Sequence, residues 1–142
     1  MNLLAPVSDI MIKDVITVKP DNSLDSVREI FEKHNIHHIP VVDGETLVGM
    51  ISKSDYLFFS KDFGSNFYDK YIEEIRRKNY DVKEVMTTKL ARLESDDRIN
   101  VALEVFRVNR FHALPVVEND KLVGIVTTFD IIDYLAKVDH YL

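Results

Sequence analysis

Short runs of apolar residues follow each other along this chain in an order that predicts its secondary structure. Residues 15–18 form a short apolar strand, and apolar residues at helical spacing then predict an amphipathic helix over residues 24–31. Two further apolar runs, at residues 39–42 and 47–51, are separated by an Asp-Gly-Glu turn and predict an antiparallel hairpin. A second helix is expected over residues 52–59. The predicted order is therefore strand, helix, strand, strand, helix.

The same order returns in the second half of the chain, and the two copies align without a gap. Met11 corresponds to Met86, and the offset of 86 − 11 = 75 residues holds for the other pairs. The identical positions, given by their first-copy members, are Val7, Met11, Asp21, Glu29, Phe31, His37, Pro40, Val41, Val42, Leu47, Val48, Gly49 and Asp55. An internal repeat indicates a duplicated structural unit. We therefore expect a first repeat over residues 7–59 and a second over residues 82–137.

Composition narrows the classes of protein that fit. The chain has 142 residues, of which 46% are hydrophobic, and each repeat alone is small for a stable core, so we expect one shared core. The net charge of −6 argues against a nucleic-acid partner, because phosphate binding requires clustered Lys and Arg. Cysteine is absent, which excludes disulfides and thiolate chemistry. The start has no signal-like segment and no run reaches the roughly 20 apolar residues of a membrane span, so a cytoplasmic location is expected.

A connector over residues 60–81 separates the repeats. Tyr71, Ile72 and Ile75 have helical spacing and predict a helix over residues 68–78. Eight of the 14 aromatic residues lie between Tyr56 and Tyr80, so the connector has two interpretations. It packs on the shared core, as apolar stripes usually do, or its rings form an interface with another subunit or a partner.

Polar residues recur where the second strand of each hairpin meets the following helix. Ser52 and Asp55 have the spacing of a capping box, in which the hydroxyl and the carboxylate satisfy backbone N–H groups. Thr127 and Asp130 have the same spacing in the second repeat. The same geometry also suits a nucleotide, because a helix N-terminus favours phosphate and a carboxylate accepts hydrogen bonds from ribose hydroxyls. Capping and binding are compatible, and both interpretations stay open here.

The repeated motifs together resemble a pair of CBS domains, known as a Bateman module. The resemblance is carried by His-Xaa-(Ile/Leu)-Pro-Val-Val, by Leu-Val-Gly-Xaa-(Ile/Val)-(Ser/Thr)-Xaa-Xaa-Asp and by the leading (Asp/Glu)-(Ile/Val)-Met, each present twice. It covers nearly the whole chain except the connector. It implies an α/β (α+β) fold of two β-α-β-β-α repeats, packed with pseudo-twofold symmetry around two clefts. It also implies a free-standing regulatory module that binds an adenosine-containing ligand such as AMP, ADP, ATP or S-adenosylmethionine.

In such modules each cleft combines residues of both repeats. The resemblance assigns to the better cleft Thr17, Val18, Ile39, Pro40, Val41, His112, Thr127 and Asp130. It assigns to the second cleft His37, His38, Ser52, Asp55, Arg92, Leu114, Pro115 and Val116. Arg92 departs from the family pattern, because the matching residue of the first repeat is Thr17; its side chain either reaches a phosphate or fills the cleft. We therefore rank the cleft with Thr17 and Asp130 as the better site.

Histidines cluster just before the first strand of the hairpin. By the family resemblance, His37, His38 and His112 contact ligand phosphate; alternatively each bonds backbone at the helix-to-strand turn. His34 and His38 have a metal-ligand spacing only if the helix continues, and the nearby Pro40 argues against that. Without an obvious third ligand, no metal site is expected.

The sequence contains no catalytic motif, so we expect a protein that is not an enzyme. The hypothesis is a regulatory module that needs no cofactor, binds its adenosine-type ligand, forms a homodimer and modulates a partner protein. Neither a nucleic-acid nor a membrane partner is expected. The alternative is a protein-interaction and dimerisation scaffold with vestigial clefts, in which Ser52, Asp55, Thr127 and Asp130 are only caps. A third interpretation is a divalent-metal sensor that uses His34, His37 and His38.

Overall fold

The computed structural model describes residues 2–60, 67–109 and 111–138. The chain divides into two compact units, each described by itself. Unit 2 is the continuous stretch Ile16–Leu90, and unit 1 combines Met1–Val15 with Ala91–Leu142. The two units therefore do not coincide with the two sequence repeats, because the opening segment of each repeat belongs to the unit that holds the hairpin of the other repeat.

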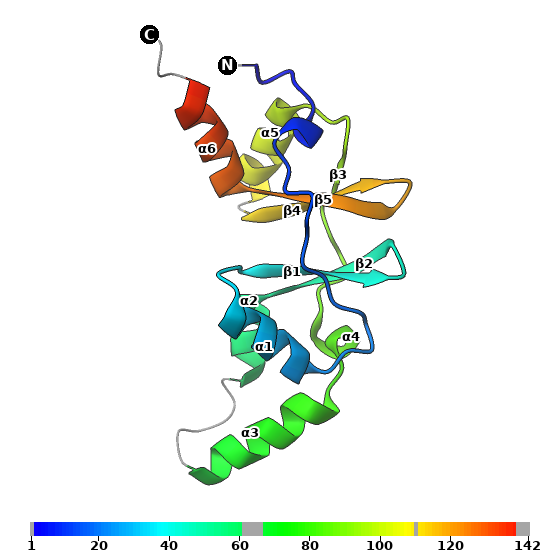
Figure 1. Ribbon diagram of the computed structural model, residues 1–142, viewed down its shortest axis with the longest axis vertical. Helices are drawn as coiled ribbons and strands as arrows, with labels where there is room; N and C mark the ends of the chain where they lie inside the picture. The colour runs from blue at the N-terminus through cyan, green and yellow to red at the C-terminus, as the bar shows by residue number, and fades with distance from the viewer. Residues whose placement is uncertain (1, 61–66, 110, 139–142) are drawn as a thin grey trace. The chain divides into compact units, whose positions relative to one another are not determined.

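Unit 2 is built around one hairpin with two helices beside it (Figure 1). Its elements are α1 (Leu24–Lys33), β1 (His38–Asp43), β2 (Thr46–Ser52), α2 (Lys53–Ser60), α3 (Phe67–Asn79) and α4 (Val82–Val85). Strands β1 and β2 pair antiparallel, with a bulge between Val41 and Val42. The hairpin turn contains Gly44 at φ 64°, a left-handed conformation in which glycine has no steric penalty. Helix α1 begins at Ser23, whose side chain accepts the N–H of Ser26 as an N-cap.

Unit 1 repeats this plan with small differences. Its elements are η1 (Val7–Asp9), β3 (Leu93–Glu94), α5 (Ile99–Asn109), β4 (Ala113–Glu118), β5 (Lys121–Thr127) and α6 (Thr128–Val138). Strand β4 pairs antiparallel with β5 and parallel with β3. The turn of this hairpin has two left-handed residues, Asn119 at φ 52° and Asp120 at φ 64°. Asn and Asp tolerate this conformation better than other side chains, so no glycine is required.

The predicted helices and hairpins are confirmed, with ends that differ by at most three residues. The expected strand over residues 15–18 is only a single bridge, in which Val18 lies parallel to Val41. The short helices η1 and α4 were not predicted, since three or four residues carry no readable period. Residues 61–66 of the connector lie outside the described part of the chain. No helix of the described part is both long and apolar enough to cross a membrane.

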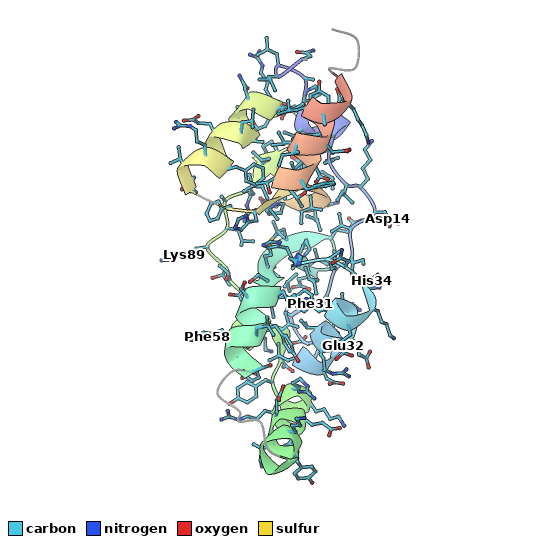
Figure 2. The ribbon with its side chains drawn as sticks, turned by 90° about the vertical axis from the view of Figure 1, so that its left-hand side faces the viewer. Asp14, Phe31, Glu32, His34, Phe58 and Lys89 are labelled. Carbon is cyan, nitrogen blue, oxygen red and sulfur yellow. The ribbon has the colours of Figure 1, made fainter. Side chains whose placement is uncertain are left out.

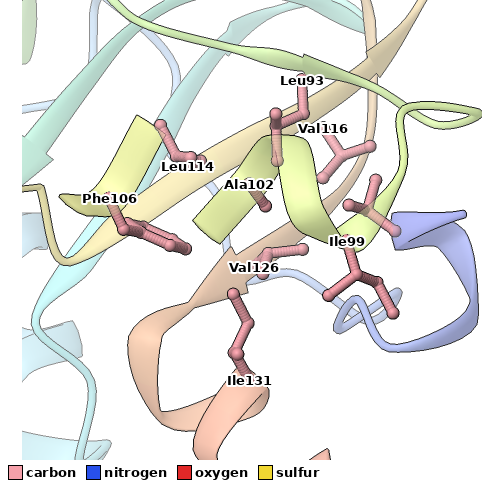
Figure 3. Packing of buried hydrophobic residues seen from close by; sticks show 9 residues of the cluster. Leu93, Ile99, Ala102, Phe106, Leu114, Val116, Val126 and Ile131 are labelled. Carbon is pink, nitrogen blue, oxygen red and sulfur yellow. The ribbon is translucent and has the colours of Figure 1, made fainter. Parts of the chain in front are cut away.

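Each unit has its own cluster of buried apolar residues, and a single core shared by both units stays a prediction. In unit 1 the cluster joins α5, β4, β5 and α6 with Val7 of the opening segment (Figure 3). In unit 2 it joins α1, the hairpin and Tyr56 of α2 with Val82 of α4. Val7 and Val82 are both fully buried, and they correspond in the repeat. Each core is thus completed by a residue from the opening segment of the other repeat.

The glycine in the second strand of each hairpin is explained by the exchange of opening segments between the repeats. A Cβ atom at Gly49 would lie 2.5 Å from the Met86 sulfur, and a Cβ atom at Gly124 would lie 2.5 Å from the Met11 sulfur. Backbone hydrogen bonds hold each methionine segment in place: Met50 N–H donates to Thr87 O at 3.0 Å, and Ile12 N–H donates to Ile125 O at 2.9 Å. Each opening segment therefore needs a glycine on the strand against which it packs.

We expect Gly49→Ala and Gly124→Ala each to lower the free energy of unfolding by about 1–3 kcal/mol, the usual cost of forcing a methyl group into a packed site. Urea unfolding of the full chain measures this. Because the conflict at Gly49 is with Met86, the cost of Gly49→Ala should fall when Met86→Ala is present. Gly44→Asn is the matched control, since Gly44 has no atom within 4 Å of the added Cβ. A double-mutant cycle with no coupling between Gly49 and Met86 would contradict this account.

Candidate functional site

The junction of β2 and α2 in unit 2 is a capping box. Ser52 Oγ accepts the backbone N–H of Asp55 at 3.0 Å, and Asp55 Oδ2 accepts the backbone N–H of Ser52 at 3.1 Å. Both side chains are half-buried, at the edge of the unit rather than in its core. The box satisfies two of the backbone donors that every helix start leaves unpaired.

The junction of β5 and α6 in unit 1 has the same geometry. Thr127 Oγ1 accepts the N–H of Asp130 at 3.2 Å, and Asp130 Oδ2 accepts the N–H of Thr127 at 2.7 Å. A histidine backbone lies next to each junction. The N–H of Lys53 donates to His37 O at 2.8 Å, and that of Thr128 donates to His112 O at 3.1 Å. The structure therefore brings His37 to the start of α2 and His112 to the start of α6.

Each box leaves polar atoms for a ligand. Only Oδ2 of Asp55 and of Asp130 takes part in the cap, so Oδ1 of each carboxylate remains for a second donor. The hydroxyl groups of Ser52 and Thr127 act as acceptors in the cap, so their protons remain for donation. The positive end of the helix dipole favours an anion. The unused oxygen and proton of each box are therefore accessible without opening the cap.

The residues that the first repeat is expected to supply to the better cleft, Thr17, Val18 and Ile39 to Val41, lie side by side within unit 2. Val18 N–H donates to Pro40 O at 3.2 Å, and Val18 O accepts the N–H of Val42 at 2.9 Å. Thr17 is half-buried directly beside this bridge. The side chains of Ile39 and Val41 are 0% exposed and belong to the core, so only their backbone groups are left for a ligand.

The corresponding residues of unit 1 include one change of chemical type, at Arg92. Leu114 and Val116 are buried in the core at 1% and 0% exposure, and Pro115 between them is also buried. Arg92, which replaces the threonine of the first repeat, has Nη1 at 3.4 Å from Asp120 Oδ1 in the hairpin turn. An exposed pair of this kind contributes little to stability. In this structure the Arg92 side chain is thus directed to the β4–β5 turn.

The histidines do not assemble as metal ligands do. His34 terminates α1 with extended backbone, at φ −127° and ψ 140°, so the helical spacing of His34 and His38 is broken. Within the described ranges, no group of three or more His, Asp or Glu side chains comes together. His37 and His112 are exposed, and His38 is half-buried opposite Ser52 in the hairpin.

Lys53 lies beside the first junction and is not among the predicted site residues. It is exposed at the first position of α2, next to Ser52, and its counterpart in α6 is Thr128. A cation is disfavoured at a helix start, where the dipole is already positive. The difference is visible in the sequence, where Ser-Lys-Ser-Asp stands in the first repeat and Thr-Thr-Phe-Asp in the second. The lysine makes the start of α2 more positive than the start of α6.

The expected site residues fall into four local groups. Unit 2 holds the group from Thr17 and Val18 with Ile39 to Val41, expected in the better cleft, and the Ser52–Asp55 junction with its histidines, expected in the second. Unit 1 holds the Thr127–Asp130 junction of the better cleft and the Arg92 group of the second. Each group is formed within its own unit by the contacts above. The assignment of two groups to one cleft stays a prediction from the family resemblance.

The model of the CBS domain family matches residues 7–62 and 82–137. These matches cover most of the chain and coincide with the two repeats. The chain therefore belongs to the CBS domain family, and it carries the domain twice.

Known proteins resemble the chain over nearly its whole length. Inosine-5′-monophosphate dehydrogenase of Methanocaldococcus jannaschii is 34% identical over 126 residues, which cover 87% of this chain and 22% of the dehydrogenase. The uncharacterized protein MJ1232 of the same organism is 33% identical, with 92% of this chain and 39% of that protein covered. The chain thus spans between about a fifth and two fifths of these relatives.

Two solved structures are similar in fold and in length. CBSX2 in complex with AMP has a TM-score of 0.79 and 26% identity, with 94% of this chain and 98% of that chain covered. The CBS domain pair of protein MJ0100, in complex with 5′-methylthioadenosine and S-adenosyl-L-methionine, has a TM-score of 0.72 and 27% identity, with 93% and 96% covered.

We expect Asp55→Ala and Asp130→Ala each to lower the free energy of unfolding by about 1 kcal/mol, because each removes one half of a capping box. Asp133→Ala is the control, since it removes only an exposed pair with Lys137 within α6. Its cost should be a few tenths of a kcal/mol. Thermal unfolding without ligand measures all three, and an equal loss in the control would contradict a capping role.

Proposed function

We propose that this chain is a regulatory module that binds an adenosine-containing ligand, of the class of AMP, ADP, ATP or S-adenosylmethionine. The observation that carries the proposal is the pair of capping boxes. Each holds a hydroxyl proton and a carboxylate oxygen, unused by the cap, at the start of a helix. These are the groups that a phosphate and a ribose require.

The ligand class is supported by the solved relatives. The structures of CBSX2 and of the MJ0100 domain pair contain AMP, methylthioadenosine and S-adenosylmethionine, which share an adenosine group. Both relatives cover this chain almost completely at 26% and 27% identity. A shared adenosine group with variable 5′ substituents fits a site in which the carboxylate recognises ribose.

Each ligand group has a candidate partner in the chain. The free Oδ1 atoms of Asp55 and Asp130 would accept from ribose hydroxyls. The hydroxyls of Ser52 and Thr127, with His37 and His112 nearby, would donate to phosphate. The backbone around Val18 and Pro40 would contact the adenine ring, because the neighbouring side chains are buried in the core.

We assign no reaction to the chain. The match to inosine-5′-monophosphate dehydrogenase covers only 22% of that enzyme, so its activity is not carried over. A module of this kind acts by binding: the ligand favours one of two arrangements of the module, and a partner distinguishes them. Homodimerisation, the partner and a cytoplasmic location stay predictions.

We expect AMP, ADP, ATP or S-adenosylmethionine to give a heat of binding in calorimetric titration and to raise the melting temperature. Asp130→Asn should weaken binding by at least about tenfold, because it removes a charged acceptor, while an amide at this position still caps the helix. Asp55→Asn is the matched control and should have a smaller effect, since its cleft contains Arg92 in place of threonine. Equal effects would refute the ranking of the clefts.

The alternative is an interaction scaffold with vestigial clefts. The exposed apolar residues of the helices favour it, notably Phe58 on α2 at 74% exposure and Phe129 on α6 at 68% (Figure 2, where Phe58 is labelled). The scaffold alternative predicts no ligand binding in the same titration. Absence of heat and of any thermal shift at millimolar ligand would remove the nucleotide proposal and leave the scaffold.

A further inference from the structure

Helix α3 of the connector turns its charged side toward α1 and its apolar side outward. Glu73 and Arg77 face a groove of about 530 Å³ that Asp25 and Arg28 of α1 line from the other side. Tyr71 and Ile75, at 57% and 40% exposure, lie on the opposite side of the helix. An amphipathic helix normally buries its apolar stripe, so this orientation is the reverse of the usual one.

An ion-pair network joins the two helices. Arg77 Nη1 lies 2.6 Å from Glu73 Oε1 of its own helix, and Arg77 Nε lies 3.5 Å from Asp25 Oδ1 of α1. Arg28 Nε donates to the same Asp25 oxygen at 2.9 Å, and Arg28 Nη1 lies 2.7 Å from Glu32, which is labelled in Figure 2. Of the ion pairs found in the described part of the chain, Arg77–Asp25 is the one that links α3 to α1.

The two guanidinium groups both act on Asp25. The hydrogen bond from Arg28, with a smaller contribution from Arg77, holds the pKa of Asp25 below its usual range. The Asp25 carboxylate therefore remains charged at neutral pH and attracts the Arg77 guanidinium as an ion pair.

From residue 70 to 79, apolar packing does not anchor α3. None of its side chains from residue 70 to 79 is buried, and none packs against the apolar cluster of unit 2. The flanking rings Phe59 and Tyr80 do pack there, with centroids 5.2 Å apart. Core packing therefore holds for these two flanking rings and is not seen for residues 70–79 of α3, and for the connector as a whole both interpretations stay open. The attachment is also incomplete, because Arg77 Nε is buried without a hydrogen bond, which costs free energy.

We propose that α3 is a detachable arm, held on α1 through Arg77, which is released while the rest of unit 2 stays folded. Segments with few buried apolar contacts open locally at a lower free energy than the fold as a whole. The arm rests on α1, and Tyr56 of α2 lines the groove between them. Release of the arm opens this groove. The arm does not depend on the proposed ligand.

Hydrogen exchange of the full chain, followed by mass spectrometry without ligand, tests the arm. Arg77→Gln and Lys78→Gln each remove one i, i+4 ion pair within α3, with Glu73 and Glu74 respectively, so their effects on the helix itself are matched. Only Arg77→Gln removes the link to Asp25. We expect it to speed exchange over residues 67–79 by at least about tenfold, as loss of a partly buried charged bond does. Lys78→Gln should change that exchange by less than about twofold.

Peptides from β1 and β2 report on the rest of the unit and should exchange at the same rate in both variants. Asp25→Asn removes the link from the α1 side without altering α3, and it should release the arm as Arg77→Gln does. Equal exchange in the Arg77 and Lys78 variants would show that Arg77 is not the anchor. Faster exchange of β1 and β2 in the Arg77→Gln variant would show that α3 is an integral part of the unit. Either result would overturn the proposal.

Discussion

The contact between a methionine side chain and a strand glycine fixes the architecture on which the rest of this structure depends. Met86 lies on Gly49 in unit 2, and Met11 lies on Gly124 in unit 1, each supported by backbone hydrogen bonds between its segment and the strand. Each opening segment therefore completes the core around the hairpin of the other repeat, through Val7 and Val82. The same crossing leads the chain from Met11 in unit 1 to Val18, which pairs with Pro40 and Val42 in unit 2. The position of Thr17 thus follows from the exchange.

At the strand-to-helix junctions, the atoms that stabilise the helix start are also those on which the proposed binding depends. A capping box is useful without any ligand, because it satisfies backbone donors at the helix start. Its chemistry nevertheless leaves one carboxylate oxygen and one hydroxyl proton unused at a positive helix end. The family membership gives this arrangement its functional meaning, since the same junction occurs twice in a chain of the CBS family. The differences between the copies, Lys53 against Thr128 and Arg92 against Thr17, then distinguish two sites that the duplication made alike.

Much of the fold was predictable because the main elements are long and strongly patterned. The apolar period of α1 and α5 and the turns between paired strands are local properties, and both copies agree on them. The completion of each core by the opening segment of the other repeat could not be predicted, because this exchange is a long-range property. Only the repeated Met and Gly indicated it. The outward apolar face of α3 could not be predicted, since the ion pairs of Arg77 with Glu73 and Asp25 reverse the side that its apolar stripe would bury. At the site, the residue types and the caps were predictable, whereas the pairing of Arg92 with Asp120 depends on the conformation of a turn.

The exchange of opening segments also has a consequence for how such a chain arises. A single repeat, made alone, would lack the opening segment that covers its hairpin here, because that segment comes from the other repeat. Two separate copies of one repeat would satisfy each other by trading their first dozen or so residues, as domain-swapped dimers do. Duplication and fusion place both partners in one polypeptide, so the mutual completion no longer depends on protein concentration. After fusion, the two halves are free to diverge, since neither has to match a copy of itself.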